Sequence, residues 1–272
     1  MRRAPTLPLT LYTLGYHSYA MNREKFIVPP LCEVPAGPFL MGSDLAHDVH
    51  ARENEMPQHT VVLLAFEIAQ FPVTVAEYAY AIKAHIVPEP FDWNRQLTQP
   101  MRPIVNIAWR HALAYAEWLA TITEEPWFLP TEAQWEKAAR GTDGRIYPWG
   151  DTWTPERASF PYSPIGQHPT GASPYGAHDM AGNIEQWVTS YTMPYPYDPT
   201  DGREDLTVHE DNTDFKGSLS GIWAVRGSRG GSGDIPSARA VWERAAERGG
   251  HYPSINYENE YGFRLLRGST VS

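Results

Sequence analysis

Cysteine is almost missing from this chain, because Cys32 is the only one among its 272 residues. A single thiol cannot close an intramolecular disulfide, which excludes a small secreted scaffold stapled by disulfides. Long apolar runs are missing too, and no segment approaches the roughly 18 apolar residues of a membrane-spanning helix. The chain begins with Arg2 and Arg3, but Pro5 and Pro8 interrupt the apolar stretch that a signal peptide needs. We therefore expect a soluble, cytoplasmic protein with no membrane span.

Positive charge is also scarce. The chain carries 22 Lys and Arg against 32 Asp and Glu, a net charge of -10. An acidic surface repels phosphate backbones and anionic lipids, so no nucleic-acid partner is expected. The sequence has no Gly-x-Ser-x-Gly nucleophile elbow, and its glycine-rich run at 227–233 lacks the lysine of a phosphate-binding loop. Nothing therefore indicates a serine hydrolase or a nucleotide-binding enzyme.

Aromatic residues, proline and glycine are abundant, with 12% aromatics, 25 Pro and 21 Gly. This composition predicts an α+β domain of loops and short strands, in which aromatic side chains fill the spaces between loops. Two helices are expected to begin at capping boxes, Thr74 with Glu77 and Thr131 with Gln134. Apolar periodicity predicts another helix over about 106–121. We therefore expect two to three helices.

No internal repeat or change of composition divides the chain into two cores. Residues 1–30 form an extended, proline-punctuated segment in this interpretation, and residues 31–272 form one domain. Strands are expected over 31–41 and 60–68, and a long, polar, exposed loop over 191–217.

A series of short motifs follows in order between residues 34 and 266. The motifs include Leu-Pro-Thr-Glu at 129–132 and Gly-Phe-Arg at 262–264. The whole series occupies 34–43, 55–61, 71–74, 103–109, 112–119, 129–136, 147–150, 175–183, 225–228 and 262–264. It resembles the formylglycine-generating-enzyme (sulfatase-modifying factor) family, and the resemblance implies a C-type-lectin-like fold. In such a framework, Arg226 and Arg264 have donors that can tie loop carbonyls together.

The resemblance allows the family's copper chemistry to be tested against the residues. Oxidase members bind copper through two cysteines just after the strand that matches 226–228. Soft thiolates select Cu(I), so both sulfurs must lie close together. The matching stretch here, 226–239, contains no cysteine, and Cys32 matches neither position. We expect no copper, assign no catalytic residue, and predict that Cys32 is a buried or partly buried structural thiol.

A second enzymatic branch of the family makes sulfur–carbon bonds with non-heme iron. The resemblance implies that its ligands come from an additional N-terminal helical domain, and the residues before Leu31 are too few for that domain. His47 and His50, with Glu53 and Glu55 nearby, come closest to a metal cluster. Their His-x-x-His spacing in a polar segment favours a solvated loop over a catalytic site.

The resemblance also implies a structural calcium ion. In the family, Gly-Asn-x-x-Glu-Trp supplies oxygen ligands, and here the motif occupies 182–187 with glutamine at the usual glutamate position. The predicted calcium ligands are Asn183, Ile184, Glu185 and Gln186. Calcium accepts an amide oxygen, but one fewer carboxylate weakens the site. The family's other calcium loop would fall near Ser159, a poorer ligand than the usual asparagine.

Residues 229–261 have the composition of an adaptable contact surface, rich in Tyr, Ser, Gly, Asn and His between framework motifs. The segment resembles the variable proteins of diversity-generating retroelements, some of which share this fold and vary at adenine-derived codons. The resemblance implies a non-catalytic display protein that binds a protein or other macromolecule. The predicted ligand-binding residues are Ser232, Asp234, Ile235, Ser237, Trp242, Arg244, His251, Tyr252, Ser254, Ile255, Asn256, Tyr257 and Asn259.

Two alternatives to display remain open. The chain can be an unspecialised family member without a diversified surface, because ordinary loops also favour Ser, Gly, Asn and Tyr. It can also be a metal-dependent oxidoreductase of the formylglycine-generating or sulfoxide-synthase type.

Overall fold

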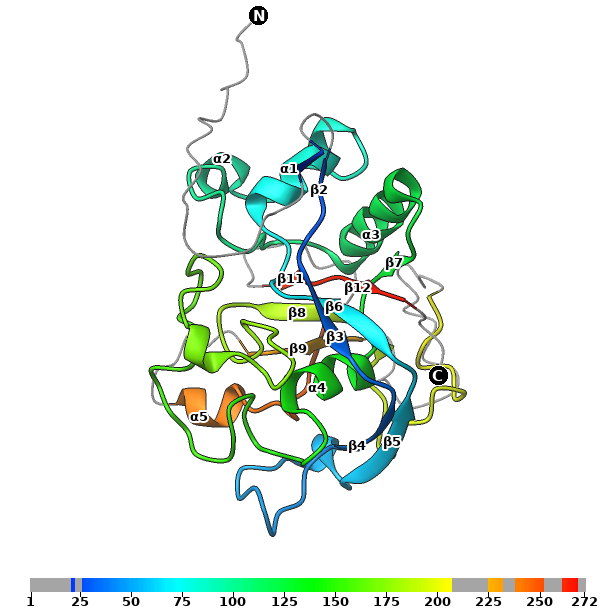
Figure 1. Cartoon of the computed structure of the whole chain (residues 1–272), viewed down its shortest axis with the longest axis vertical. Coiled ribbons are helices and arrows are strands. Elements are labelled where there is room, and N and C mark those ends of the chain that lie inside the picture. Colours follow the sequence, from blue (N-terminus) through cyan, green and yellow to red (C-terminus); the bar gives the residue numbers. More distant parts are fainter. Residues whose placement is uncertain (1–20, 23–25, 207–224, 232–237, 252–260, 269–272) are drawn as a thin grey trace, which may run out of the picture.

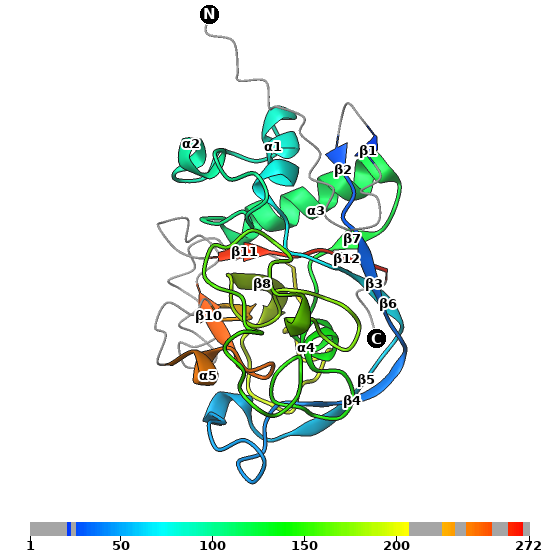
Figure 2. The ribbon, with the colours of Figure 1, turned by 60° about the vertical axis from the view of Figure 1, so that its left-hand side comes forward.

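The structure is a computed structural model that describes residues 21–22, 26–206, 225–231, 238–251 and 261–268. Three helices gather at one end of the molecule: α1 (Val75–Lys83), α2 (Trp93–Gln96) and α3 (Trp109–Thr123). The hairpin of β4 (Gly37–Met41) and β5 (His59–Leu63) lies at the opposite end (Figures 1 and 2). Two small sheets fill the space between these ends.

The first sheet joins the two ends of the domain. Its order is β3 (Leu31–Val34), β6 (Phe66–Ala69), β12 (Leu266–Arg267) and β7 (Trp127–Phe128), with every pair antiparallel. Register places Ile68 between Cys32 and Leu266, and both Ile68 and Leu266 are fully buried. The chain just after the late motif at 262–264 is thus paired with strands from the beginning of the domain.

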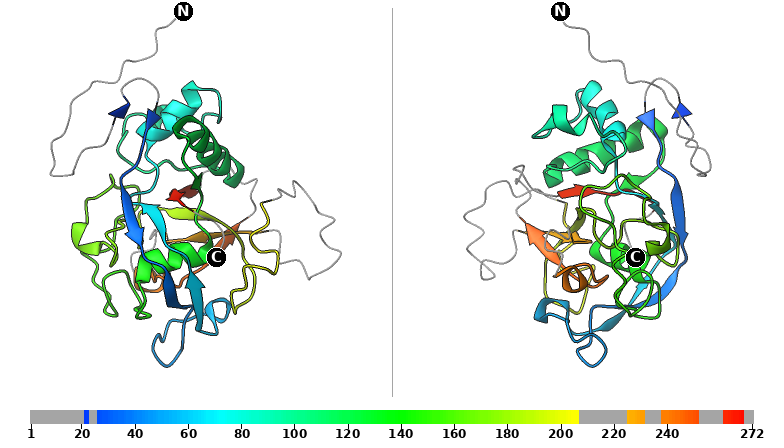
Figure 3. Two further views of the ribbon diagram at one scale, coloured as in Figure 1. Left: turned by 45° about the vertical axis from the view of Figure 1, so that its right-hand side comes forward. Right: turned by 90° about the vertical axis from the view of Figure 1, so that its left-hand side faces the viewer.

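The second sheet carries the region predicted to bind ligand. Its order is β10 (Gly249–His251), β9 (Arg226–Arg229), β8 (Glu185–Tyr191) and β11 (Tyr261–Phe263). β11 runs parallel to β8, and the other pairs are antiparallel. Strands from distant parts of the sequence therefore lie side by side in the centre of the molecule (Figure 3).

The expected capping boxes are present. Thr74 and Glu77 cap α1, and Thr131 and Gln134 cap α4 (Glu132–Arg140), with both reciprocal hydrogen bonds formed in each. The helix expected from residue 106 begins later, at the first residue of α3, because Asn106 has a left-handed φ of 61°.

Several short elements were not expected from the sequence. They are the one-turn helices α2 and α5 (Arg239–Trp242), and the 3-10 turns Glu53–Glu55 and Pro169–Gly171. A short ladder of β1 (Met21–Asn22) and β2 (Phe26–Ile27) was not expected either. Phe26 packs against the helical core, so this part of the N-terminal segment lies on the domain.

Each expected strand is divided in two. The strand predicted over 31–41 becomes β3 and β4, and that over 60–68 becomes β5 and β6. The division has a topological reason, because β4 and β5 pair with each other while β3 and β6 belong to the first sheet. The same stretch of chain bends from one sheet into the next.

The core consists of two hydrophobic clusters. In the helical cluster, Tyr78 stacks on Tyr115 with ring centroids 5.7 Å apart, and Phe263 meets both rings edge-on. The second cluster packs α4 against the sheets through residues such as Trp135 and Val188. None of the helices in the described ranges has the length and apolar character needed to cross a bilayer.

Candidate functional site: a surface on a buried arginine framework

The predicted binding surface, residues 229–261, begins in β9, passes through α5 and β10, and ends at β11. Figure 2 shows α5 and β10 on the same side of the molecule. Among its predicted contacts, His251 pairs through its backbone with Arg226, and Trp242 ends α5. The following predicted contacts lie outside the described residues: Ser232, Asp234, Ile235, Ser237, Tyr252, Ser254, Ile255, Asn256, Tyr257 and Asn259.

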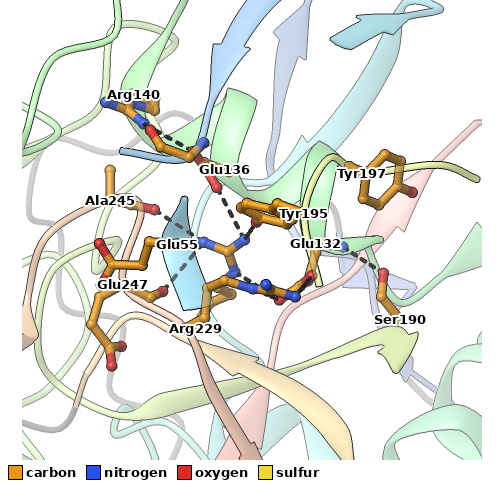
Figure 4. A network of polar contacts seen from close by, with 12 residues as sticks. Glu55, Glu132, Glu136, Arg140, Ser190, Tyr195, Tyr197, Arg229, Ala245 and Glu247 are labelled. Carbon is orange, nitrogen blue, oxygen red and sulfur yellow. Dashed lines mark hydrogen bonds and ion pairs between the residues drawn. The ribbon is translucent and has the colours of Figure 1, made fainter. Parts of the chain in front are cut away.

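Arg229, the last residue of β9, is fully buried at the centre of the network in Figure 4. Its Nη2 donates to Glu136 Oε2 at 3.0 Å and to the Tyr195 hydroxyl at 2.9 Å. Its Nη1 donates to the carbonyls of Ala245 and Glu247 at 3.3 and 3.2 Å. The side chain therefore ties β9 to α4 and to the chain that follows α5.

Arg248, just before β10, makes a second buried cross-link. Its Nε and Nη2 donate to the two carboxylate oxygens of Glu132 at 2.8 and 2.6 Å, a bidentate geometry that fixes both side chains. Its Nη1 also donates to the carbonyl of Asn54 at 2.6 Å. The backbone N–H of Glu132 donates to the Ser190 hydroxyl at 2.9 Å, which joins α4 to β8 (Figure 4).

Arg244 is buried rather than displayed, which corrects its assignment as a ligand contact. Its side chain has no exposed area. Nη1 donates to Asp48 Oδ2 at 2.7 Å and to Glu55 Oε2 at 2.6 Å, and Nη2 donates to Glu55 Oε1 at 2.6 Å. Because two carboxylates occupy these donors, the residue stabilises the base of the surface.

We call Arg229, Arg244 and Arg248, with the carboxylates of Asp48, Glu55, Glu132 and Glu136, the arginine framework. Burial removes these ions from water, so each depends on its partners for compensation. Loss of one partner leaves an uncompensated buried charge and typically costs about 3–5 kcal/mol. The framework consequently holds β9, α4 and the start of β10 in one fixed arrangement.

Two carboxylates in and beside the framework have opposite pKa shifts. Burial alone would raise the pKa of Glu132, but the charges of Arg248 and Arg229 outweigh it and hold this pKa below its usual value. Burial, reinforced by the nearby carboxylate of Glu185, raises the pKa of Glu247 to about 8. Its one ion pair among the described residues, to Arg52, is 3.6 Å long. A proton on Glu247 is therefore favoured by the fold near neutral pH.

Trp242 is the predicted contact side chain that the structure places at the surface. It is 41% exposed, and the guanidinium of Arg52 lies 3.6 Å from its ring centroid. The helix that carries it is fixed by Arg239, which donates to Glu243 Oε1 at 2.6 Å and to the carbonyl of Ser159 at 2.7 Å. A large aromatic ring is thus presented on a rigid turn, an arrangement typical of contact residues.

Gly231 makes the close approach at the start of the surface possible. It has a φ of 60°, and a Cβ on it would lie 2.4 Å from the carbonyl oxygen of Trp242. Any larger residue would push the chain leaving β9 away from α5. The glycine therefore allows the chain leaving β9 to lie directly against the C-terminal end of α5.

Cys32 is a buried thiol in β3, as predicted, and it is 7% exposed. Burial raises its pKa, although the charge of Arg264 opposes this shift. A protonated, enclosed thiol is a poor metal ligand and a poor nucleophile. The predicted carbonyl ties are confirmed as well, since Arg264 donates to the carbonyl of Ala69 at 2.8 Å and Arg226 to that of Thr189 at 2.6 Å.

The side chains of the predicted calcium ligands do not all converge on one position. Glu185 accepts from the Ser228 hydroxyl at 2.6 Å, whereas the amide oxygen of Gln186 accepts from Trp135 at 3.0 Å and from Arg264 at 2.6 Å. Successive side chains of a strand point to opposite faces, so these two side chains cannot ligate one ion together.

Asn183 fits a cation better than Gln186 does. Its Oδ1 is buried without a hydrogen-bond partner in the described part of the chain, and so is Asp179 Oδ2. Both residues bond to Ser159, Asn183 through its backbone N–H at 3.2 Å and Asp179 through its other carboxylate oxygen at 2.5 Å. Calcium binding stays a prediction, with Asn183 as its best-placed ligand.

The polar loop near residue 50 does not assemble a metal site. The Nε2 atom of His47 lies 3.4 Å from Oδ2 of Asp151, and the carboxylate of Glu55 accepts hydrogen bonds from Arg244. Within the described ranges, no group of three or more His, Cys, Asp or Glu residues is placed to hold a metal ion.

Sequence reasoning missed the carboxylates that pair with the arginines. Glu132 and Glu136 lie four residues apart in a recognised motif, which places both on one face of α4. Two acids beside a tryptophan on one face of a short helix indicate that this face is buried and that its carboxylates need cationic partners. The partners Asp48 and Glu55 had no such signal, because they lie in an irregular loop far from Arg244 in sequence.

Comparison with known proteins identifies the family. The model of the sulfatase-modifying factor enzyme 1-like domain matches residues 17–269, and the chain belongs to this family. The formylglycine-generating enzyme of Streptomyces coelicolor is 28% identical over 303 residues, covering 88% of this chain and 89% of that enzyme. The hercynine oxygenase of Mycolicibacterium thermoresistibile is 33% identical over 200 residues, covering 58% of this chain and 43% of the oxygenase. The chain thus matches less than half the length of that relative.

A solved structure supports the fold independently. Treponema denticola variable protein 1 superimposes with a TM-score of 0.61 at 20% identity, over 87% of this chain and 94% of that protein. At this identity the likeness concerns the fold alone. It confirms the predicted α+β, C-type-lectin-like architecture and the resemblance to a variable protein.

Proposed function

We propose that this protein is a non-catalytic binding protein, of the kind found among retroelement variable proteins, that displays residues 229–261 to a protein or other macromolecular ligand. The observation that carries the proposal is the arginine framework. Its buried ion pairs fix the chain on both sides of 232–237 and leading into 252–260, where most of the predicted contacts lie. A preformed base reduces the ordering cost of binding.

The composition of the surface supports the same function. Framework positions carry buried Arg and Glu, whereas the predicted contacts carry Tyr, Ser, Asn and Ile. Separation of the two sets allows the contacts to vary without disturbing the base. The fold similarity to a variable protein adds support, because that protein carries the same architecture.

The test is genetic. We expect sibling isolates to differ at adenine-derived codons within 232–259, with the codons of Arg229, Arg244 and Arg248 unchanged. A near-repeat of the 3′ end beside a reverse transcriptase gene is expected in the neighbouring DNA. Identical 3′ ends across many isolates, with no such repeat, would contradict diversification and leave binding to be measured directly.

The alternative is a metal-dependent oxidoreductase. It is favoured by the 33% identity to a hercynine oxygenase and the matching length of a formylglycine-generating enzyme. Against its copper form stands the single cysteine of the chain, which cannot form a thiolate pair. Elemental analysis of purified protein, followed by oxygen uptake with hercynine plus a thiol or with a cysteine-containing peptide, decides between them. Stoichiometric copper or iron with turnover would establish the enzyme; neither metal and no uptake is the expected result.

A further inference from the structure

A cavity of about 420 Å³ opens on the helical side of the molecule. It lies between residues 92–106, which include α2, and Tyr162. Its volume falls within the roughly 300–1,000 Å³ of small-molecule sites. All of its described lining precedes residue 163, so it is separate from the surface 229–261 and does not depend on the proposed function.

The cavity walls are held by hydrogen bonds of the protein itself. The N–H of Val75 donates to the carbonyl of Arg102 at 2.9 Å, and the N–H of Ile165 to that of Met101 at 3.0 Å. The side-chain amide of Gln96 both accepts from and donates to the backbone of Val105 at 3.2 Å. The walls are thus fixed in advance, as expected of a binding site.

Arg102 is the lining residue whose side chain has no hydrogen-bond acceptor in the described part of the fold. It lines the cavity, and no described residue accepts a hydrogen bond from its guanidinium; its Nε is fully buried without a partner. Guanidinium groups inside proteins are normally matched by carboxylates or carbonyls, because an unmatched buried donor costs about 1–3 kcal/mol. The missing partner of Arg102 is an acceptor that the described chain does not supply.

The charges around the cavity specify the acceptor. Arg95 is already paired with Asp92 at 3.3 Å, so these two lining residues neutralise each other. Arg102 then leaves one positive charge, which matches a monoanion. A phosphate dianion would bring excess negative charge towards Asp92, whereas a carboxylate can accept two parallel hydrogen bonds from the guanidinium.

The remaining walls specify an apolar body. Val75, Pro103 and Val105 line the cavity together with Tyr162, whose backbone has a φ of 54°. A bulky residue in the left-handed region is uncommon and is held there by its surroundings. These apolar side chains lie beside the unpaired cation, with Thr98 and three amide side chains completing the lining, and such a mixture suits an amphiphilic small molecule.

We propose that this cavity binds a small organic monocarboxylate with a compact apolar body, and that Arg102 is the residue that recognises its carboxylate. Asn106 and Gln99 line the same cavity and supply polar edges around the carboxylate. The site is a ligand-binding site of the family scaffold at a distance from the displayed surface.

The test is isothermal titration calorimetry of the full chain with benzoate, benzamide and inorganic phosphate at constant ionic strength. Benzoate is expected to bind, and benzamide, its neutral isostere, at least about tenfold more weakly, because it lacks the charge-assisted bond. Arg102→Gln should weaken benzoate about tenfold or more, and Arg102→Lys less. Phosphate binding as tightly as benzoate in an Arg102-dependent manner would overturn the monocarboxylate assignment.

Two further variants keep the test independent of folding. Gln99→Trp narrows the cavity while keeping Arg102, and it should also abolish benzoate binding. Arg157→Gln removes an arginine that does not line the cavity, and it should bind benzoate as the unaltered chain does. Equal benzoate binding by the unaltered chain, Arg102→Gln and Gln99→Trp, or no benzoate binding to the unaltered chain, would overturn the site.

Discussion

Arg229 and Arg102 are two arginines that the same chain treats in opposite ways. Arg229 is fully buried, and its side chain donates to a carboxylate, a hydroxyl and two carbonyls. Arg102 lines a cavity, and its guanidinium has no hydrogen-bonding partner among the described residues. The Nε of each arginine is buried without a hydrogen-bond partner, so the difference lies in the two Nη groups: those of Arg229 have four acceptors within the fold, whereas those of Arg102 have none among the described residues and are available for a ligand. The number of acceptors around each guanidinium therefore distinguishes an arginine of the scaffold from an arginine of a binding site.

Arg229→Gln is expected to have the largest effect. The shorter amide cannot reach all four acceptors and carries no charge, so Glu132 loses one of its two nearby cations and Glu136 keeps only Arg140. The free energy of unfolding should therefore fall by about 3–5 kcal/mol. Chemical denaturation monitored by circular dichroism measures this. The matched control is Arg102→Gln, the same substitution in the cavity. Equal unfolding midpoints for the two variants would break the comparison.

Glu247→Gln tests the buried carboxylate beside the framework. Its folded pKa is raised to about 8, so its contribution to stability is complete below the unfolded value of about 4.5 and is lost as pH rises through about 8. The unaltered chain should therefore be less stable at pH 8 than at pH 6.

The glutamine variant imitates the protonated acid, so it should be more stable than the unaltered chain at pH 8 by about 1–3 kcal/mol and should show a smaller change between the two pH values. Thermal unfolding at both pH values measures the difference. A variant whose midpoint follows pH as steeply as the unaltered chain would show that other groups, such as Glu243 with its pKa raised to about 7, dominate.

Trp242→Ala should have a small effect on stability. The ring is 41% exposed and its cation–π contact with Arg52 is at the surface, so the loss should be about 0.5–1 kcal/mol. Arg52→Ala removes the same contact from the other side together with the ion pair to Glu247, so its loss should be at least as large. A loss above about 3 kcal/mol would place Trp242 in the core rather than on the surface.

Arg102→Gln should change stability least, by less than about 0.5 kcal/mol, because its side chain makes no hydrogen bond to the described protein. The same denaturation measurement applies. A gain in stability would agree with relief of an unmatched buried donor, while a loss of several kcal/mol would show that Arg102 is a scaffold residue like Arg229.

Much of the local structure could be predicted from the residues. The capping boxes at Thr74 and Thr131 formed because each hydrogen-bonding pair lies within one turn of helix. The buried state of Cys32 followed from the usual behaviour of a lone cysteine, and the roles of Arg226 and Arg264 followed from motifs with a defined position in the fold. Local chemistry and family pattern were sufficient for these features.

Other features could not be predicted, because they depend on residues distant in the chain. Arg244 was expected on the binding surface, and only the fold brought Asp48 and Glu55, almost two hundred residues away, against its guanidinium. Gln186 was expected at a calcium ion, and the alternation of side chains along β8 turned it towards Arg264 instead. The cavity around Arg102 had no signal in the sequence at all.

The sequence by itself determined the family, the absence of a thiolate pair and the segment whose composition indicates binding. These properties depend on which residues are present and in what order. The tertiary structure alone decided which arginine side chains have acceptors within reach. A guanidinium has the same chemistry at every position in the chain, and its role depends on the acceptors that folding places within hydrogen-bonding distance.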